Sequence, residues 1–224
     1  MVLKAVSLTV NVQKQLREAI NEALNNSPKR KFEESVELIV TFPGLDVKKA
    51  DVKLREVLFL PHAPKKKSKI CIVAEGDLAL QAKGMEGFHR VLSKAELEEL
   101  GKSKKMVKKL AKDCDWVLVQ SDLMGLAGRI LGPALGPRGK IPIAVPPRAD
   151  LKQFLDRYNR AVIVRIKDQP QIQTKIGTVS NTIDELVENA MAVLNLIDSK
   201  LRGVVKIGDI YIKKTMGKPV KIKL

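Results

Sequence analysis

Two kinds of predicted strand occur in the chain, and their order constrains the fold more than any other feature. Near both ends, polar and apolar residues alternate, as in 34–42 and 205–212, which is typical of strands with one buried face. In the middle, residues 70–74 and 116–119 are apolar throughout and are separated by helical segments, which is typical of a buried parallel sheet. The sequence therefore predicts an α/β protein whose middle folds differently from its ends.

Each end also carries an amphipathic helix, predicted at 12–26 and at 182–200, with apolar residues at three- and four-residue spacing. A lysine run that follows two prolines separates the first end from the middle. We therefore expect a discontinuous α+β domain and an inserted Rossmann-like α/β domain, formed by residues 1–66 with 158–224 and by residues 67–157, respectively.

The remaining elements are predicted from periodicity and from helix-start patterns. Ser93 with Glu96, and Thr182 with Glu185, have the spacing of a capping box. Strands 161–166 and 171–176 are expected to pair across the turn between them. The Gly- and Pro-rich residues 132–147 are expected to form a long ordered loop. Further helices are predicted at 76–83, 93–101, 123–131 and 150–158, and further strands at 52–60, 88–92 and 220–224.

The cysteines and the apolar segments bear on the compartment. The two cysteines, Cys71 and Cys114, lie in apolar surroundings without close spacing, which favours buried free thiols in a reducing compartment, with a disulfide as the alternative. The sequence shows no signal-peptide pattern and no apolar run long enough for a membrane span. The expected compartment is the cytoplasm.

The charge of the chain points to a polyanionic partner. Lys and Arg number 41 against 25 Asp and Glu, which gives a net charge of +16. Nucleic acid is the commonest such partner, and an acidic membrane surface is the alternative. Residues 199–224 hold eight basic residues and one acidic residue. Residues 102–112 hold six lysines, which we expect to form a solvated helix face with little effect on the main RNA contact.

A short corner near the C-terminus has the groups that a nucleic-acid backbone requires. Lysines flank Thr215, Met216 and Gly217 between two predicted strands. Lysine neutralises phosphate, threonine forms hydrogen bonds, and glycine permits close approach. The alternative is a tight turn with solvated lysines.

Motifs for cofactor or catalytic chemistry are absent from the sequence. Neither the dinucleotide-binding glycine pattern nor the phosphate-loop pattern is complete. His62, Cys71, His89 and Cys114 do not have the spacing of metal ligands, and we expect both histidines to be structural or at the surface. No nucleophile with a poised base is recognisable. We expect no cofactor, no metal and no enzyme, although an enzyme of the central domain remains the rival interpretation.

Aromatic residues make up only 4% of the chain, which disfavours single-strand binding by stacking. Structured RNA or DNA, recognised by backbone and shape, is the better expectation. Four stretches in order carry a resemblance to the ribosomal protein L1 family of the large-subunit stalk, closest to its archaeal and eukaryotic branch: 31–37, 58–62, 128–139 and 214–217.

This resemblance implies a two-domain fold in which the domain made of both chain ends binds the stalk element of large-subunit rRNA. It implies contacts at the strand that follows Lys31 and at the corner. A polar turn containing Asp168 is a further implied contact, and in the Gly/Pro loop Arg138 and Lys140 are expected to reach RNA. The implied first-domain RNA-binding residues are Lys31, Phe32, Glu34, Ser35, Glu37, Asp168, Lys214, Thr215, Met216, Gly217 and Lys218.

The resemblance also implies the partners and the role. The protein would be a cytoplasmic ribosomal protein, monomeric off the ribosome, that assists release of the exit-site tRNA. It would also repress translation of its own mRNA through the same surface. A peripheral protein on acidic membranes is the third interpretation, and it would require a basic helix with a large exposed apolar face.

Overall fold

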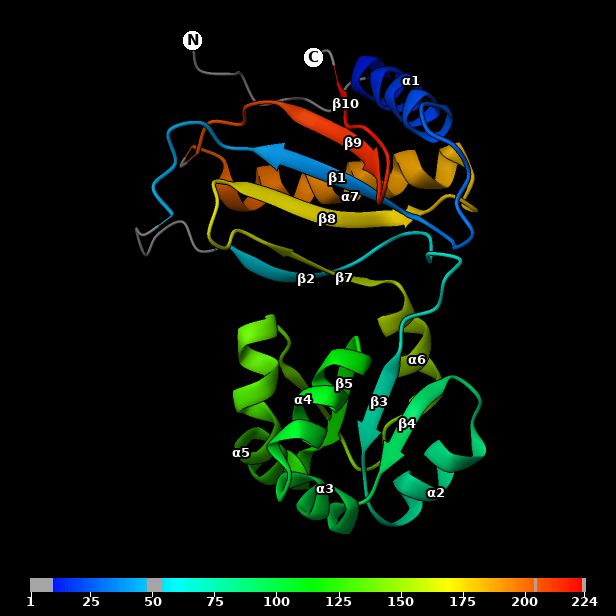
Figure 1. Cartoon of the computed structure of the whole chain (residues 1–224), viewed down its shortest axis with the longest axis vertical. Helices are drawn as coiled ribbons and strands as arrows, with labels where there is room; N and C mark the ends of the chain where they lie inside the picture. Colours follow the sequence, from blue (N-terminus) through cyan, green and yellow to red (C-terminus); the bar gives the residue numbers. More distant parts are fainter. Residues whose placement is uncertain (1–9, 48–53, 204, 223–224) are drawn as a thin grey trace. The chain divides into compact units, whose positions relative to one another are not determined.

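The computed structural model describes residues 10–47, 54–203 and 205–222 of the 224-residue chain. The chain divides into two compact units, of which unit 1 consists of residues 1–66 and 160–224, and unit 2 of residues 67–159 (Figure 1). Helices and strands occur in both units, and each unit has its own sheets. The chain is therefore a mixed α/β protein, as the two kinds of strand predict.

The main sheet of unit 1 is antiparallel and has the strand order β10-β9-β1-β8. On β1, the residues Val36, Leu38 and Val40 are buried, while the residues between them are half-exposed. The alternation predicted for this strand is confirmed. The strands of this sheet are β1 (Ser35–Thr41), β8 (Gln171–Thr178), β9 (Ile210–Lys214) and β10 (Val220–Lys221).

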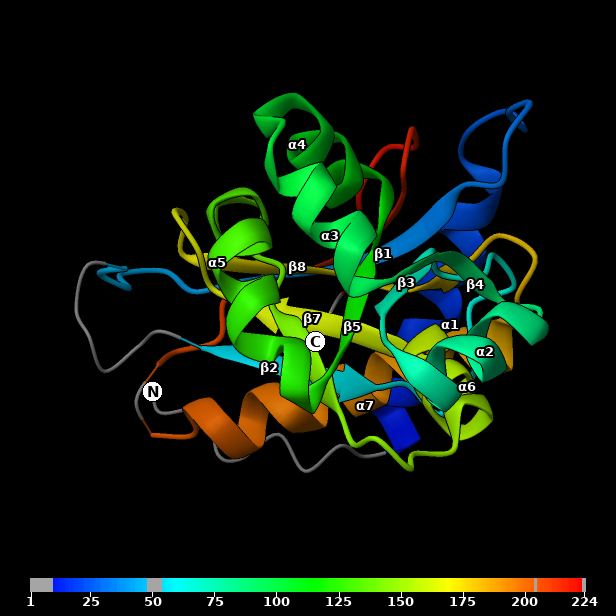
Figure 2. The same ribbon diagram turned by 90° about the horizontal axis from the view of Figure 1, so that it is seen from below.

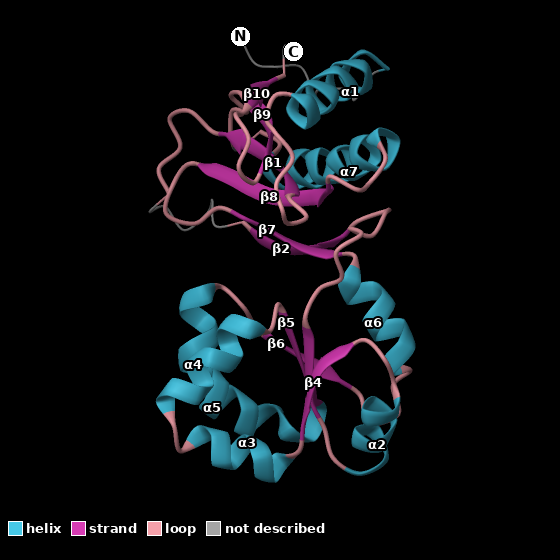
Figure 3. Cartoon of the chain, turned by 45° about the vertical axis from the view of Figure 1, so that its right-hand side comes forward, coloured by secondary structure: helices cyan, strands magenta, loops and turns pink. Residues whose placement is uncertain are grey.

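Helices α1 (Val10–Asn25) and α7 (Ile183–Leu201) cover the same face of this sheet (Figures 1 and 3). Their apolar sides join the buried side of β1 in one core. The Thr182–Glu185 capping box starts α7, as predicted. A separate two-stranded sheet pairs β2 (Arg55–Phe59) with β7 (Ala161–Arg165). Neither helix lies on the opposite, polar face of the four-stranded sheet.

Unit 2 is a parallel sheet with helices on both faces (Figures 2 and 3). Its strand order is β4-β3-β5-β6, and all four residues of β3 are buried. The Ser93–Glu96 capping box starts α3, as predicted. The strands are β3 (Ile70–Val73), β4 (Phe88–Leu92), β5 (Trp116–Gln120) and β6 (Pro142–Val145).

The helices of unit 2 divide between the two faces of the sheet (Figure 3). One layer comprises α3 (Lys94–Gly101), α4 (Lys104–Asp113) and α5 (Met124–Leu135), and the other comprises α2 (Gly76–Gly84) and α6 (Leu151–Asn159). The first layer packs on a core that includes Cys71 and Val73 of β3. Two short 3-10 turns, η2 (Ser121–Leu123) and η3 (Gly136–Arg138), flank α5.

The preferred interpretation of the cysteines is wrong. Cys71 on β3 and Cys114 at the end of α4 form a disulfide, with their Cα atoms 5.8 Å apart. They are 43 residues apart in the sequence, and such a separation gives no sign that the end of α4 packs on β3. Both lie in the same buried cluster. The apolar surroundings that suggested separate thiols are the two sides of one core.

Three predicted elements also differ from the structure. Within the predicted loop 132–147, residues 132–135 continue α5 through Pro133 and residues 142–145 form β6. In α5, burial of Leu131, Ala134 and Leu135 outweighs the lost N–H of the proline. The strand predicted at 205–212 starts only at Ile210, since Val205 N still donates to Leu201 O at the end of α7.

The third difference concerns pairing. Strands β7 and β8 pair with β2 and β1, respectively, and not with each other. An isolated bridge between Ile166 and Ile172, beside their connecting turn, and a hydrogen bond from Thr174 Oγ1 to Ile163 O join them. The carbonyl of Pro170 in that turn accepts from Phe42 N at the end of β1, so the turn directs β8 onto β1. In the predicted strand 52–60, residues 52 and 53 lie outside the described residues.

Candidate nucleic-acid interface

The Thr-Met-Gly corner (Thr215–Gly217) connects β9 to β10 and projects from the end of the four-stranded sheet. Thr215 is exposed, and Met216 is 58% exposed. The corner therefore presents a thioether to solvent from the five-residue connection 215–219.

Hydrogen bonds from the start of β1 fix the backbone of the corner. Ser35 N donates to Thr215 Oγ1 at 3.0 Å, and Thr215 N donates to Ser35 O at the same distance. Met216 N donates to Oε1 of Glu34 at 3.0 Å. Glu34 is only 2% exposed, so its carboxylate supports the corner from within. The geometry favours a positioning role for Glu34 over the expected direct RNA contact.

Lys214 has a similar supporting position. It is 3% exposed, and its Nζ donates to Leu24 O and Ser27 O, each at 3.0 Å. These carbonyls lie at the C-terminal end of α1, where a cation satisfies free acceptors and interacts favourably with the helix dipole. Asn26 Nδ2 donates to Lys218 O at 3.1 Å. Lys214 therefore joins the corner to α1, while the side chain of Lys218 is exposed.

Gly217 is required by space rather than by an unusual backbone angle. A Cβ at this position would lie 3.1 Å from Lys214 Cβ and 3.1 Å from Ser27 Oγ. Its N–H donates to Lys214 O at 3.0 Å, which closes the turn. The absence of a side chain thus lets the corner pack directly against the end of α1.

The polar face of the sheet extends from the corner along β1. Glu37 lies between Lys213 of β9 and Lys175 of β8 in the strand register. Gln173 Nε2 donates to Glu37 Oε2 at 2.7 Å. This row alternates cations, which suit phosphate, with a carboxylate, which accepts from a hydroxyl or a base edge. Gln173 and Lys175 were not among the predicted contacts, although they occupy the outward positions of a predicted strand.

Lys31 and Phe32 lie in the connection between α1 and β1, shortly before Ser35, the first residue of β1. Both are exposed, Phe32 by 53%. Beside them, the pKa of Glu33 is lowered, chiefly because the hydroxyl of Thr178 hydrogen-bonds to its carboxylate. The start of β1 therefore combines an exposed aromatic ring and an exposed cation with the corner.

Asp168 is not brought together with the corner. It lies in the turn before β8, and β8 residue Gln171 pairs with Thr41 at the far end of β1. Six residue steps along β1 separate the two ends, about 20 Å at the usual strand rise. Asp168 forms an exposed ion pair with Lys167 at 2.9 Å. This turn borders a polar hollow of about 440 Å³ that Glu37 and Gln173 also line.

The expected contacts of unit 2, Arg138 and Lys140, both hydrogen-bond to backbone carbonyls. Arg138 Nη1 donates to Ala134 O at 2.9 Å. Lys140 Nζ donates to Ala111 O at 3.0 Å and to Cys114 O. The pKa of Lys140 is lowered, chiefly by burial. The geometry favours roles at helix ends over the expected RNA contact.

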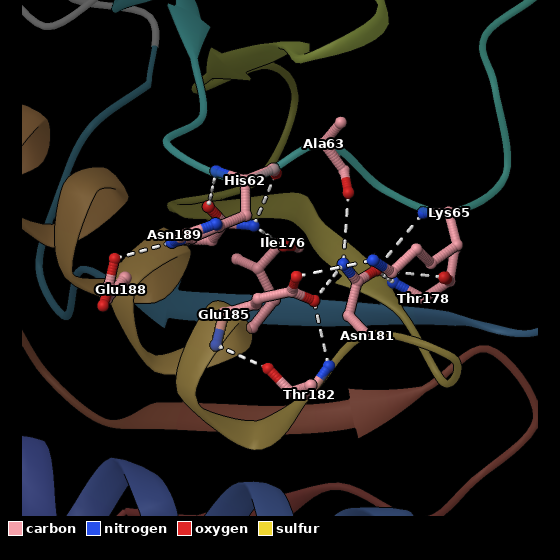
Figure 4. A network of polar contacts seen from close by, with 10 residues as sticks. All are labelled: His62, Ala63, Lys65, Ile176, Thr178, Asn181, Thr182, Glu185, Glu188 and Asn189. Carbon is pink, nitrogen blue, oxygen red and sulfur yellow. Dashed lines mark hydrogen bonds and ion pairs between the residues drawn. The ribbon is translucent and has the colours of Figure 1, made fainter.

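A second polar network holds residues 62–65 against α7 (Figure 4). Asn189 Oδ1 accepts from His62 N at 2.9 Å, and Asn189 Nδ2 donates to His62 O at 2.9 Å. His62 Nε2 is 2.6 Å from Oε2 of Glu188. Asn181 Nδ2 donates to Ala63 O at 3.1 Å. These contacts agree with a structural histidine, and they show the role of two asparagines that the sequence analysis did not single out.

No helix in the described ranges has an apolar stretch long enough to cross a bilayer. Within the same ranges, His, Cys, Asp and Glu side chains do not gather in groups of three or more that could hold a metal ion. The corner and the polar sheet face of unit 1 therefore remain the best-formed candidate site.

Comparison with known proteins identifies close relatives over nearly the full chain. The model of the Ribosomal protein L1p/L10e family matches residues 22–218. Relatives named large ribosomal subunit protein uL1 include that of Aeropyrum pernix, 51% identical over 207 residues, which cover 92% of this chain and 94% of the relative. The uL1 protein of Staphylothermus marinus is 48% identical over 211 residues (94% and 97%), and that of Saccharolobus solfataricus is 47% identical over 214 residues (96% and 96%).

Proposed function

The chain belongs to the Ribosomal protein L1p/L10e family, and we propose that it is a structural, non-catalytic protein of the large ribosomal subunit in the cytoplasm. Unit 1 binds the stalk element of large-subunit rRNA through the corner and the polar face of its sheet. The relatives named above come from archaea, which agrees with the branch that the sequence resembles. Off the ribosome the protein is monomeric.

The observation that carries this proposal is the fixed backbone of an exposed corner. Glu34 and Ser35 hold the backbone N–H groups and the hydroxyl of the corner, while Met216 faces solvent. A surface that is ordered before binding loses little conformational entropy on association. Such a surface suits a folded RNA that is recognised by its shape and its 2′-hydroxyls.

The proposed contacts lie near the corner and along β1, with one further contact at the far end of β1. Phosphate is neutralised and bases are stacked by exposed cations and the aromatic ring near the corner, while Glu37 accepts from a hydroxyl or a base edge. Asp168 is a separate contact at the other end of β1. Glu34 and Lys214 position the corner. The proposed direct contacts of unit 1 are Lys31, Phe32, Ser35, Glu37, Asp168, Thr215, Met216, Gly217 and Lys218.

The proposal includes two finer roles, one for unit 2 and one for the RNA-binding surface of unit 1. Unit 2 extends toward the exit-site tRNA and assists its release as the stalk moves. An mRNA segment that resembles the stalk element binds unit 1 in place of rRNA, so that the protein represses translation of its own message. Support for these roles comes from the family membership and from the single, preformed surface of unit 1.

The test is binding to a stalk-element hairpin and to a scrambled hairpin of equal length across a salt series. A preference for the stalk hairpin that persists at high salt is expected, because hydroxyl and shape contacts are less sensitive to salt than phosphate contacts. Equal binding to both hairpins, lost together as salt rises, would reduce the function to general attraction for polyanions. Competition by the leader of the protein's own mRNA tests the repressor role.

A further inference from the structure

Helix α4 carries a one-sided row of cations that the stalk-binding surface does not use. Five of its ten residues are lysines and its first turn contains no acidic residue. At about 100° per residue, these lysines fall within an arc of about 140° on the helix. We name this row the α4 lysine stripe; it consists of Lys104, Lys105, Lys108, Lys109 and Lys112.

The stripe faces solvent. All five lysines are exposed, whereas Val107, Leu110 and Ala111 on the opposite side of the helix are buried against the unit 2 core. Among the described residues, no acidic side chain forms an ion pair with a lysine of the stripe. Its charge is therefore available to a partner.

The arrangement opposes the stability of α4 itself. Lys104 with Lys108, Lys105 with Lys109, and Lys108 with Lys112 are like-charge pairs at four-residue spacing, which destabilise a helix. Lys104 and Lys105 also lie at the N-terminal end, where the helix dipole disfavours cations. An ordinary solvated helix intersperses acidic residues at these spacings. Helix stability therefore does not account for the stripe.

Both ends of α4 are held by contacts that offset this repulsion. The side chain of Ser103 accepts from Met106 N at the start of the helix. At its end, Lys140 Nζ donates to Ala111 O and Cys114 O, and the disulfide joins Cys114 to Cys71 of β3. The helix is thus a fixed support for mobile lysine side chains.

We propose that the α4 lysine stripe binds the phosphate backbone of double-stranded RNA, as a second RNA surface distinct from the corner of unit 1. Lys104, Lys108 and Lys112 follow each other at four-residue spacing, about 6 Å along the helix axis, which suits a run of backbone phosphates. Lysine is a point charge on a flexible stem and therefore follows a backbone without reading bases. A membrane surface is disfavoured, because the apolar side of α4 is buried in unit 2.

The experiment measures binding of the full chain to a plain RNA duplex without the stalk sequence, across a salt series. The test variant replaces all five stripe lysines with Gln. The matched control replaces five exposed basic residues elsewhere in unit 2 with Gln: Lys83, Arg90, Lys94, Arg148 and Lys152. A third variant replaces the stripe lysines with Arg and keeps the charge. Circular dichroism and thermal unfolding verify that each variant is folded.

The stripe variant is expected to bind the duplex at least tenfold more weakly and to show a salt slope smaller by about 3–5, one for each lost phosphate contact. The control and the Arg variant retain most of the affinity. Equal losses in the stripe variant and the control, or no loss in either, would overturn the proposal. Stripe-dependent binding to vesicles of phosphatidylserine and phosphatidylcholine, without duplex binding, would also overturn it.

Binding to the stalk hairpin separates this inference from the proposed function. The stripe variant is expected to keep wild-type affinity for the stalk hairpin, since the stripe lies in unit 2 and the corner in unit 1. Loss of stalk preference in the wild-type chain would contradict the proposed function and leave the duplex result intact. Loss of duplex binding by the stripe variant alone would support the proposed role of the stripe. The stalk-hairpin result would decide the proposed function independently.

Discussion

In the described part of unit 1, α1 and α7 cover one face of the four-stranded sheet and leave its other face without a helix, whereas unit 2 has helices on both faces of its sheet (Figure 3). The open face belongs to alternating strands, so every second residue of β1 is available to a partner at a fixed position. In unit 2 the central strands β3 and β5 are buried, and a partner meets helix surfaces, loops and the edge strands β4 and β6. The difference separates the two proposed ways to bind RNA: fixed groups that read shape, and cations on flexible side chains that follow charge.

The two units nevertheless use one device in common. In each, a lysine near the end of a helix donates to the last carbonyls: Lys214 to the end of α1, and Lys140 to the end of α4. From the sequence, both lysines are expected to contact RNA. Basic residues that look alike in a list of motifs therefore divide, in the structure, between helix caps and open surface.

The largest effect expected from the comparison concerns the disulfide, which is confined to unit 2. Loss of a cross-link that spans 43 residues lowers the free energy of unfolding by about 4 kcal/mol, since the unfolded chain regains loop entropy. Hydrogen exchange measured by mass spectrometry, with and without a reductant, is expected to show faster exchange in unit 2. The Cys71→Ala/Cys114→Ala variant serves as the reductant-insensitive control. Equal acceleration in both units would contradict this confinement.

The two capping lysines differ in burial, and their replacement sharpens the comparison. Lys214→Met leaves buried carbonyls without a donor and is expected to destabilise unit 1 by about 2–3 kcal/mol. Lys140 is only partly buried, so Lys140→Met is expected to cost unit 2 about 1 kcal/mol. Urea denaturation measures both. Lys218→Met, at an exposed position, is the control, and a change as large as that for Lys214 would refute the assignment of Lys214 as a cap.

Met216 separates recognition from folding. Its side chain is 58% exposed, so Met216→Ala is expected to leave the melting temperature unchanged. It is expected to weaken stalk-hairpin binding by about 1–2 kcal/mol if the thioether packs against RNA. Plain-duplex binding, assigned to the α4 lysine stripe, is expected to remain. Unchanged affinity for the stalk hairpin would reduce the corner to a turn.

Glu34 tests whether the corner is positioned from within. Glu34→Ala removes the acceptor of Met216 N and is expected to weaken stalk binding by about 1 kcal/mol. Glu34→Gln keeps a carbonyl oxygen at that position and is expected to retain most of the affinity. Isothermal calorimetry on both variants decides the role. Equal losses for Gln and Ala would indicate that the carboxylate itself contacts RNA.

Local pattern predicted much of the fold. Alternation gave the buried side of β1, apolar runs gave β3 and β5, and capping boxes gave the starts of α3 and α7. These features depend on neighbours within a few residues. The Cys71–Cys114 disulfide and the pairing of β8 with β1 depend on which distant segments meet, and local periodicity carries no information on that choice.

The candidate site shows the same division. The sequence singled out the corner and the strand after Lys31, and the structure brings the corner to the start of that strand through the bonds of Ser35. The motif-based interpretation of the sequence did not distinguish exposed from buried lysines. Lys213 and Lys214 are adjacent and differ only in which face of β9 they occupy. Alternation counted forward from Ile212 indicates that Lys214 points inward.

The smallest effects come from one substitution made in both units. Gly128 lies within α5, where a Cβ would meet nothing within 4 Å, so Gly128→Ala is expected to stabilise unit 2 by about 0.5–1 kcal/mol. At Gly217 a Cβ would lie 3.1 Å from Lys214 Cβ, so Gly217→Ala is expected to destabilise unit 1 by about 0.5–1 kcal/mol. It should also weaken stalk binding, whereas Gly128→Ala should not.

Urea denaturation measures the change in unfolding free energy for both variants. Changes of opposite sign would show that the corner is packed tightly against the end of α1, in contrast to the open outer side of α5. Stabilisation by Gly217→Ala would mean that Lys214 and Ser27 yield easily to an added methyl group. The corner would then be fixed by the hydrogen bonds of Glu34 and Ser35 rather than by close packing at Gly217. Its preference for the stalk hairpin should then survive the added methyl group, because the surface would still be ordered before binding.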